Sequence, residues 1–256
     1  MSELNVKYQL GTKENEAFLA DVREGLFSFG HNFPAPGGSS YYLGDDGTPW
    51  KDRNRETWIT SRMANVYSLA SFLGHPGSKE LAAAAIKGLR GELHDTANGG
   101  WYAGLTADGN ILPNKQCYAH AFVILAASSG VLADIPGAKE LLDDALALYD
   151  LRFWNEEEGL SCDTWNTEFT VLDDYRGLNA NMHTVEAFLA AADVTGDEKY
   201  RKCIEFVAAQ LPDVPLCKCG GLYHKVSLTG QMWLDGLYMA GPFAAEYAQK
   251  FNHPEW

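Results

Sequence analysis

The amino-acid sequence predicts an all-α protein with the architecture of an α/α toroid of the (α/α)6-barrel type. Two observations support this fold class: apolar residues recur at the helical period over most of the chain, and glycine-marked loops return between successive pairs of helices. Each of these loops leads into a helix whose first turn carries an aromatic or amide side chain together with an ionisable one. In a toroid the inner helices present their first turns at one end, so we expect these polar residues to share one cleft.

Eight helices in four successive pairs account for the periodicity. The second expected helix, 56–73, stops at the Gly-His-Pro-Gly sequence of 74–77, and Ser78 is the expected N-cap of the third helix, 79–93. The remaining helices are expected at 14–29, 116–129, 137–152, 179–193, 197–210 and 231–251.

The number of helix pairs is small for a closed ring. Six pairs need about 380 residues at the spacing of this repeat, whereas the chain has 256. Four pairs form an open arc whose last helix exposes an apolar flank. The sequence therefore predicts an incomplete toroid, folded as a single domain over 1–256.

The composition argues against several function classes. The chain has 20 Lys and Arg against 34 Asp and Glu, a formal net charge of −14, which disfavours binding to nucleic acid or to an anionic membrane surface. No apolar run is long enough to span a membrane, and the N-terminal residues lack the pattern of a secretion signal. Five cysteines, an odd and low number, fit reduced thiols better than a disulfide framework. We therefore expect a cytoplasmic protein.

Four motifs carry a family resemblance that covers about 12–210. They are Trp-Ile-Thr-Ser-Arg-Met at 58–63, Gly-Gly-Trp-Tyr at 99–102, Lys-Gln-x-Tyr-x-His-x-Phe at 115–122, and the long motif Asp-Tyr-Arg-Gly-x-Asn-Ala-Asn-Met-His-x-x-Glu-Ala-Phe-Leu at 174–189. With them the chain resembles the N-acylglucosamine 2-epimerase family, and within it the bacterial aldose–ketose isomerases of mannose or sulfoquinovose. The resemblance implies an (α/α)6 barrel whose sugar pocket is lined by four residues: Arg62, Tyr118, Asn179 and His183.

The C-terminal segment, 211–256, has a different resemblance. Its Gly-Gly-Leu-Tyr-His-Lys sequence at 220–225 and the stretch 231–243 are similar to unsaturated rhamnogalacturonyl hydrolases. That resemblance implies Asp235 as the catalytic acid and base, with His224 and Trp233 in the same pocket. The chain is therefore interpreted as a hybrid of an epimerase-like part, 1–210, and a hydrolase-like part.

Each of the two sites is incomplete. The isomerases move the proton with a pair of histidines on later helices, and the segments that hold this pair have no counterpart here. The hydrolases place a second acidic residue about where this chain has Asn179 to Asn181.

Sugar isomerisation needs a base that moves a proton between neighbouring carbons, and donors that stabilise the enediolate oxygen. His183 is the candidate base because imidazole exchanges protons near neutral pH, and its alternative is a hydrogen-bonded core histidine. For His120, substrate binding and a core role are equally open. Arg62 and Tyr118 are the candidate donors. The alternative for Arg62 is a structural ion pair with one of three partners: Glu56, Asp174 or Glu186.

Three hypotheses for the function follow. The first is a cofactor-independent sugar isomerase or epimerase, with a small-molecule sugar as substrate, no metal, and a homo-oligomer left open. The second is an unsaturated rhamnogalacturonyl or glucuronyl glycoside hydrolase using Asp235, whose apolar helix face would favour a protonated acid. The third is a catalytically silent carbohydrate-binding hybrid. The spacing of Cys203, Cys217, Cys219 and His224 is too weak to predict a metal site.

Overall fold

The computed structural model describes residues 6–173, 175–209 and 249. The chain divides into two compact units, Met1–Val207 and Ala208–Trp256, and the description below concerns the first. Among the described residues there are seven α-helices and only two-residue strands, which confirms the all-α class. The eighth expected helix, 231–251, lies outside the described residues. That one domain spans 1–256 stays a prediction.

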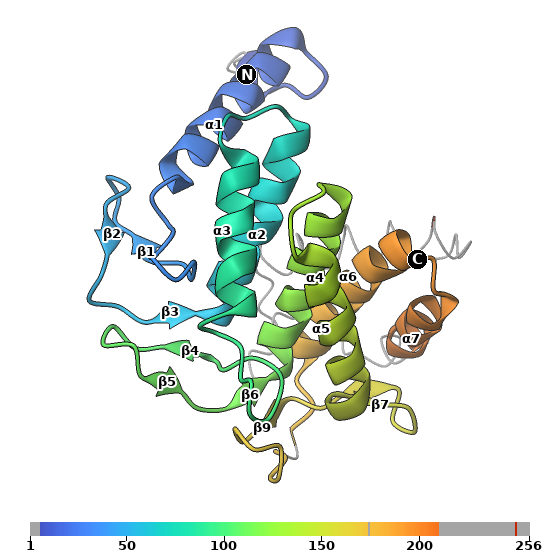
Figure 1. The fold of residues 1–256 in the computed structure, drawn as a ribbon. Coiled ribbons are helices and arrows are strands. Elements are labelled where there is room, and N and C mark those ends of the chain that lie inside the picture. Colours follow the sequence, from blue (N-terminus) through green and yellow to red (C-terminus); the bar gives the residue numbers. More distant parts are fainter. Residues whose placement is uncertain (1–5, 174, 210–248, 250–256) are drawn as a thin grey trace, which may run out of the picture. The chain divides into compact units, whose positions relative to one another are not determined.

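The helices form an inner and an outer layer. Helix α4 packs between α2 and α6, and these three helices form the inner layer (Figure 1). Helix α3 packs on α2, and α5 packs on α4. This alternation is what the paired repeat predicts. The bounds are α1 Lys13–Gly30, α2 Thr57–Phe72, α3 Ser78–Arg90, α4 Cys117–Leu132, α5 Ala138–Arg152, α6 Leu178–Thr195 and α7 Glu198–Ala209, after a short 3-10 helix at Val6–Tyr8.

The short strands lie mainly at one end of the helices (Figure 1). Strand β3 runs directly into α2 and β6 runs directly into α4, so the inner helices start at the strand end. All pairings are antiparallel: β1 with β2, β3 with β4, β4 with β5, β6 with β9, and β7 with β8. The bounds are β1 Tyr42–Leu43, β2 Pro49–Trp50, β3 Arg55–Glu56, β4 Gly104–Leu105, β5 Ile111–Leu112, β6 Lys115–Gln116, β7 Trp154–Asn155, β8 Leu160–Ser161 and β9 Thr164–Trp165.

The start of α3 corrects one prediction. Ser78 is the first residue of the helix rather than its N-cap, and its buried hydroxyl has no hydrogen-bond partner within the described ranges. The N-cap is Gly77, with φ of 76°, a left-handed conformation that favours glycine. Gly137, with φ of 82°, starts α5 in the same way. The predicted serine cap was wrong because a backbone turn, rather than a side-chain hydroxyl, begins these outer helices.

An apolar face is exposed on the first helix pair. On α1 the exposed side chains repeat at helical spacing, and on α2 a second group lies toward the C-terminal end. The sequence placed an apolar flank on the last helix, which is outside the described residues. The exposed side chains are Leu19, Val22, Leu26 and Phe29 on α1, and Val66, Leu69, Phe72 and Leu73 at the end of α2.

Candidate active site

The first two turns of α2, α4 and α6 bring three of the expected pocket residues together. Arg62 donates a hydrogen bond from Nη2 to the Tyr118 hydroxyl, at 3.0 Å. The ring of Tyr118 meets the ring of His183 edge to face, with centroids 5.1 Å apart. Phe122 contacts both His183 and Arg62: its ring centroid lies 4.6 Å from that of His183 and 4.5 Å from the guanidinium carbon of Arg62. We name Arg62, Tyr118 and His183 the pocket cluster.

Arg62 is held by aromatic rings. Its guanidinium lies 5.0 Å from the ring centroid of Trp58 and 4.5 Å from that of Phe122. Within the described part of the chain, no carboxylate lies within ion-pair distance of Arg62; Asp174, one of its expected partners, lies outside that part. Because a guanidinium has five N–H donors, Arg62 keeps donors for a ligand oxygen.

His183 uses one ring nitrogen within the protein. Nδ1 donates to Oε2 of Glu186, one turn further along α6, at 2.8 Å. The His183 side chain is 13% exposed. Nε2 has no hydrogen-bond partner among the described residues, and with the proton on Nδ1 this nitrogen is an acceptor. This geometry fits a base better than a core histidine whose two nitrogens are both bonded.

His120 shows the opposite arrangement. It is 1% exposed; Nδ1 donates to the Gln116 carbonyl at 2.7 Å, and Nε2 accepts from the Trp101 backbone N–H at 3.1 Å. Burial lowers the pKa of His120 to about 3, so the ring is neutral at physiological pH. With both nitrogens bonded, His120 has none left for a sugar, and we interpret it as a structural residue that holds the Gly-Gly-Trp-Tyr loop.

A buried ion pair supports the same loop. The Lys115 ammonium, fully buried, lies 2.7 Å from Oδ2 of Asp95 and also donates to the Gly99 carbonyl. Burial acts to raise the pKa of Asp95, but hydrogen bonds from Lys115, Asn98 and the backbone outweigh it, and the pKa lies well below its usual range. The sequence analysis did not find this pair, because a lysine beside a strand is usually solvent-exposed. We name Asp95, Lys115 and His120 the loop anchor.

Beneath the pocket cluster, a buried hydrogen-bond network joins α4, α5 and α6. The Cys117 thiol lies 2.9 Å from the Tyr149 hydroxyl, which also contacts the hydroxyl of Thr184. Burial raises the pKa of Cys117 to about 12, so its thiol stays protonated and is not a nucleophile. Because Cys117 and Thr184 directly adjoin Tyr118 and His183 in the sequence, the network fixes the spacing of Tyr118 and His183.

A pocket of about 300 Å³ opens beside Tyr118. Of the expected residues it contains Tyr118 and Asn179, whose side chain is exposed at the start of α6. It also contains residues that the sequence analysis did not identify, among them Asp163 and Tyr175. The lining residues are Gln116, Tyr118, Asp163, Tyr175, Gly177, Asn179 and Ala180.

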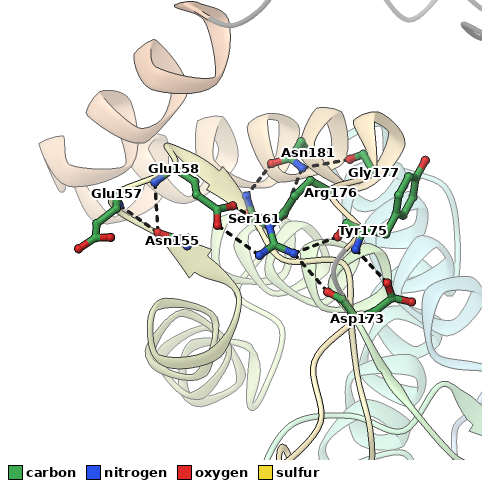
Figure 2. Close-up of polar contacts among 9 residues, drawn as sticks. All are labelled: Asn155, Glu157, Glu158, Ser161, Asp173, Tyr175, Arg176, Gly177 and Asn181. Carbon is green, nitrogen blue, oxygen red and sulfur yellow. Dashed lines mark hydrogen bonds and ion pairs between the residues drawn. The ribbon is translucent and has the colours of Figure 1, made fainter.

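The segment that carries Tyr175 into this pocket is braced by Arg176 (Figure 2). The Arg176 guanidinium binds both carboxylate oxygens of Glu158, at 2.7 and 3.3 Å, and donates to the carbonyls of Asp173 and Tyr175. Oδ1 of Asp173 in turn accepts from the backbone N–H of Tyr175, at 2.9 Å. The brace therefore links the β7–β8 hairpin to the segment before α6.

Asn181 fixes the start of α6 to the same hairpin. Its side chain is buried, accepts from the Ser161 backbone N–H at 2.7 Å, and donates to the carbonyls of Ser161 and Gly177 (Figure 2). All of its polar atoms are thus bonded within the protein, so Asn181 has a structural role next to the exposed Asn179.

Several candidate residues are not placed by this structure. Asp235, His224 and Trp233 lie outside the described residues, as do Cys217 and Cys219. Among the residues that are described, no group of three or more His, Cys, Asp or Glu side chains could hold a metal ion. None of the described helices is long and apolar enough to cross a membrane.

The layered helices, with a pocket at their starts, define an all-α protein of the α/α-toroid type. The sequence profile of the N-acylglucosamine 2-epimerase (GlcNAc 2-epimerase) family matches residues 37–213, and the chain belongs to this family. The match ends near the start of the hydrolase-like segment, so the hybrid interpretation of 211–256 stays a prediction.

Known proteins similar to this chain agree with the family. The D-mannose isomerase of Thermobifida fusca is 44% identical over 157 residues, which are 61% of this chain and 39% of that protein. A crystal structure of a D-mannose isomerase superposes with a TM-score of 0.73 at 25% identity, covering 87% of this chain and 58% of that one. Cellobiose 2-epimerase from Spirochaeta thermophila superposes with a TM-score of 0.72 at 17% identity, covering 95% of this chain and 67% of that one. At this identity the similarity shows the fold alone. The chain thus matches well under half of the Thermobifida fusca enzyme.

Proposed function

We propose that this chain is a cofactor-independent aldose–ketose isomerase of the cytoplasm, with D-mannose as the first substrate to test. The observation that carries the proposal is the pairing of His183 with Glu186, beside Tyr118, which leaves Nε2 without a partner among the described residues. The likeness to D-mannose isomerases supports the choice of sugar.

The proposed reaction moves one proton between two carbons. Nε2 of His183 takes the proton from C2 of the aldose, and the electron pair of the C–H bond forms the C1–C2 double bond of an enediolate. The O2 proton then moves to O1 as the proton held by His183 returns to C1, which gives the ketose. Glu186 orients the imidazole and stabilises its positive charge while it carries the proton.

Arg62 and Tyr118 would stabilise the enediolate oxygen. Arg62 carries a permanent positive charge and, beside the Tyr118 hydroxyl, can donate to the same oxygen. Burial raises the pKa of Tyr118, although Arg62 opposes this, so the hydroxyl keeps its proton and remains a donor. Asn179 would bind a hydroxyl at the pocket wall.

The test is proton NMR of the full chain in D₂O with D-mannose and, separately, D-fructose. We expect deuterium to enter at C2 of the aldose and signals of the other sugar to grow. His183→Asn should slow the exchange at least about 100-fold, because it removes the base. The matched control is His31→Asn, at the C-terminal end of α1, which should exchange like the wild type.

The outcomes separate the hypotheses. Equal exchange in wild type and His183→Asn would contradict the role of His183. Sugar binding without exchange would favour the catalytically silent carbohydrate-binding protein. The hydrolase alternative depends on Asp235 and would be tested with unsaturated uronides; no contact of a described residue favours it.

A further inference from the structure

Asp163 is fixed at the pocket wall by its backbone. Its carbonyl accepts a 2.7 Å hydrogen bond from the N–H of Cys117, the first residue of α4. The next residue, Thr164, pairs with Gln116 in the β6–β9 ladder. Asp163 is therefore tied to the helix start that also carries Tyr118, and the two residues line the same pocket.

The carboxylate of Asp163 is half-buried but only partly bonded. Oδ1 accepts from the Thr164 hydroxyl at 3.1 Å. Among the described residues, none donates to Oδ2 and no cationic side chain lies within ion-pair distance of the carboxylate. An ionised carboxylate that is partly removed from water is stable only when it accepts hydrogen bonds. Oδ2 thus has an unused capacity for a donor from a ligand in the pocket.

Gly177 makes room for this carboxylate. A Cβ atom at Gly177 would lie 2.4 Å from Oδ2 of Asp163 and 3.0 Å from Cε1 of Tyr175. The φ of Gly177 is −71°, an ordinary value for any residue, so the backbone conformation does not require glycine here. A Cβ atom at this position would instead displace the carboxylate of Asp163.

Tyr175 supplies an aromatic wall next to the carboxylate. Its side chain is 64% exposed, yet its backbone is held by the brace of Arg176 and Asp173 (Figure 2). A sugar presents both hydroxyl groups and C–H groups. The carboxylate can accept hydrogen bonds from the hydroxyl groups, and the neighbouring ring can pack against the C–H groups.

We propose that Asp163 binds a hydroxyl group of the sugar and that, at its wall of the pocket, it favours a neutral group of the sugar over an anionic one. This inference rests on the proposed function, because it assigns the substrate class of the pocket beside Tyr118. A carboxylate that is paired with no cation of the described residues attracts O–H donors and repels a carboxylate, sulfonate or phosphate carried by the sugar. A neutral aldose therefore fits this wall, whereas a uronate or a sulfonated sugar does not.

The test compares dissociation constants for D-mannose and D-mannuronate, which differ in the charge at C6. Titration calorimetry of the full chain should give at least about 10-fold tighter binding of D-mannose. Asp163→Asn keeps the size of the side chain but removes its charge. This variant should bind D-mannose about 10-fold more weakly, because hydrogen bonds to charged groups are stronger than those to neutral groups. The preference for D-mannose over D-mannuronate, measured as the ratio of their dissociation constants, should also decrease.

Two further variants serve as matched controls. Gly177→Ala leaves Asp163 in the chain but displaces Oδ2, so it should also weaken D-mannose binding. Asp108→Asn removes an equal charge at a turn outside the pocket and should change neither constant. Circular dichroism would confirm that each variant is folded.

The outcomes distinguish the two proposals. A ratio of constants that is the same in wild type and Asp163→Asn would overturn the assignment of Asp163 and leave the isomerase proposal standing. A wild-type chain that binds neither sugar would overturn both.

Discussion

The pocket cluster and the loop anchor contain the same kinds of side chain, a cation and a histidine beside aromatic rings, and use them differently. In the loop anchor the Lys115 ammonium pairs with Asp95, and both nitrogens of His120 are bonded. In the pocket cluster the cation, Arg62, donates to the Tyr118 hydroxyl, and Nε2 of His183 has no partner in the described part of the chain. If the pocket cluster has the role proposed above, unused hydrogen-bonding capacity, rather than residue type, distinguishes functional from structural side chains here.

The two surroundings alternate along one short segment. Lys115, Cys117 and His120 point into the interior, whereas Gln116 and Tyr118 line the pocket. Strand β6 and the first turn of α4 thus hold the protein together on one side and offer polar groups to a ligand on the other. If this division is correct, substitutions in the loop anchor should change stability, and substitutions in the pocket cluster should change binding and turnover.

The largest effect on stability is expected for Lys115→Met. The substitution leaves the Asp95 carboxylate buried without its cation, and the free energy of unfolding should fall by about 3–5 kcal/mol. Urea denaturation measures this difference. The matched control is Lys139→Met, which breaks the exposed pair with Asp143 and should change stability by less than about 0.5 kcal/mol. Similar losses in both variants would show that Lys115 is not a buried anchor.

Much of the helical framework could be predicted from the sequence. The period of apolar residues and the glycine stops place the seven described helices within a few residues of their observed bounds. Ser78 failed as a cap because the sequence does not show that Pro76 and Gly77 form a turn whose backbone begins the helix. The local period of apolar residues predicts where helices lie, whereas the identity of the capping residue depends on the backbone conformation before the helix.

The site could be predicted only where a motif marks it. The resemblance pointed to Arg62, Tyr118, Asn179 and His183, and of these Arg62, Tyr118 and His183 lie together. It did not include His120, whose role stayed open in the sequence because burial is decided by tertiary contacts. The roles of Asp163 and Lys115 could not be predicted for the same reason. The burial of Lys115 depends on its ion pair with Asp95, and the space for the Asp163 side chain depends on Gly177 in the loop before α6.

A smaller effect is expected for His120→Leu. The substitution leaves the buried N–H of Trp101 without an acceptor, so the free energy of unfolding should fall by about 1–3 kcal/mol. The affinity of the folded protein for D-mannose should not change, because His120 offers no free nitrogen to the pocket. His183→Leu should show the reverse pattern, with small loss of stability and loss of turnover. Weaker sugar binding in folded His120→Leu would overturn the division between the two regions.

The last effect concerns the response to acid. The pKa of His120 is about 3 in the folded chain, while an unfolded histidine titrates near 6.5. Between these values the unfolded state binds more protons, so the free energy of unfolding should decrease as the pH falls below about 6.5, by up to about 1.4 kcal/mol per pH unit. Urea denaturation of wild type and His120→Gln between about pH 6.5 and 4.5, above the range where Asp95 contributes, measures this slope. The variant should have the shallower slope, because glutamine binds no proton in either state; equal slopes would mean that the buried imidazole does not contribute to acid sensitivity.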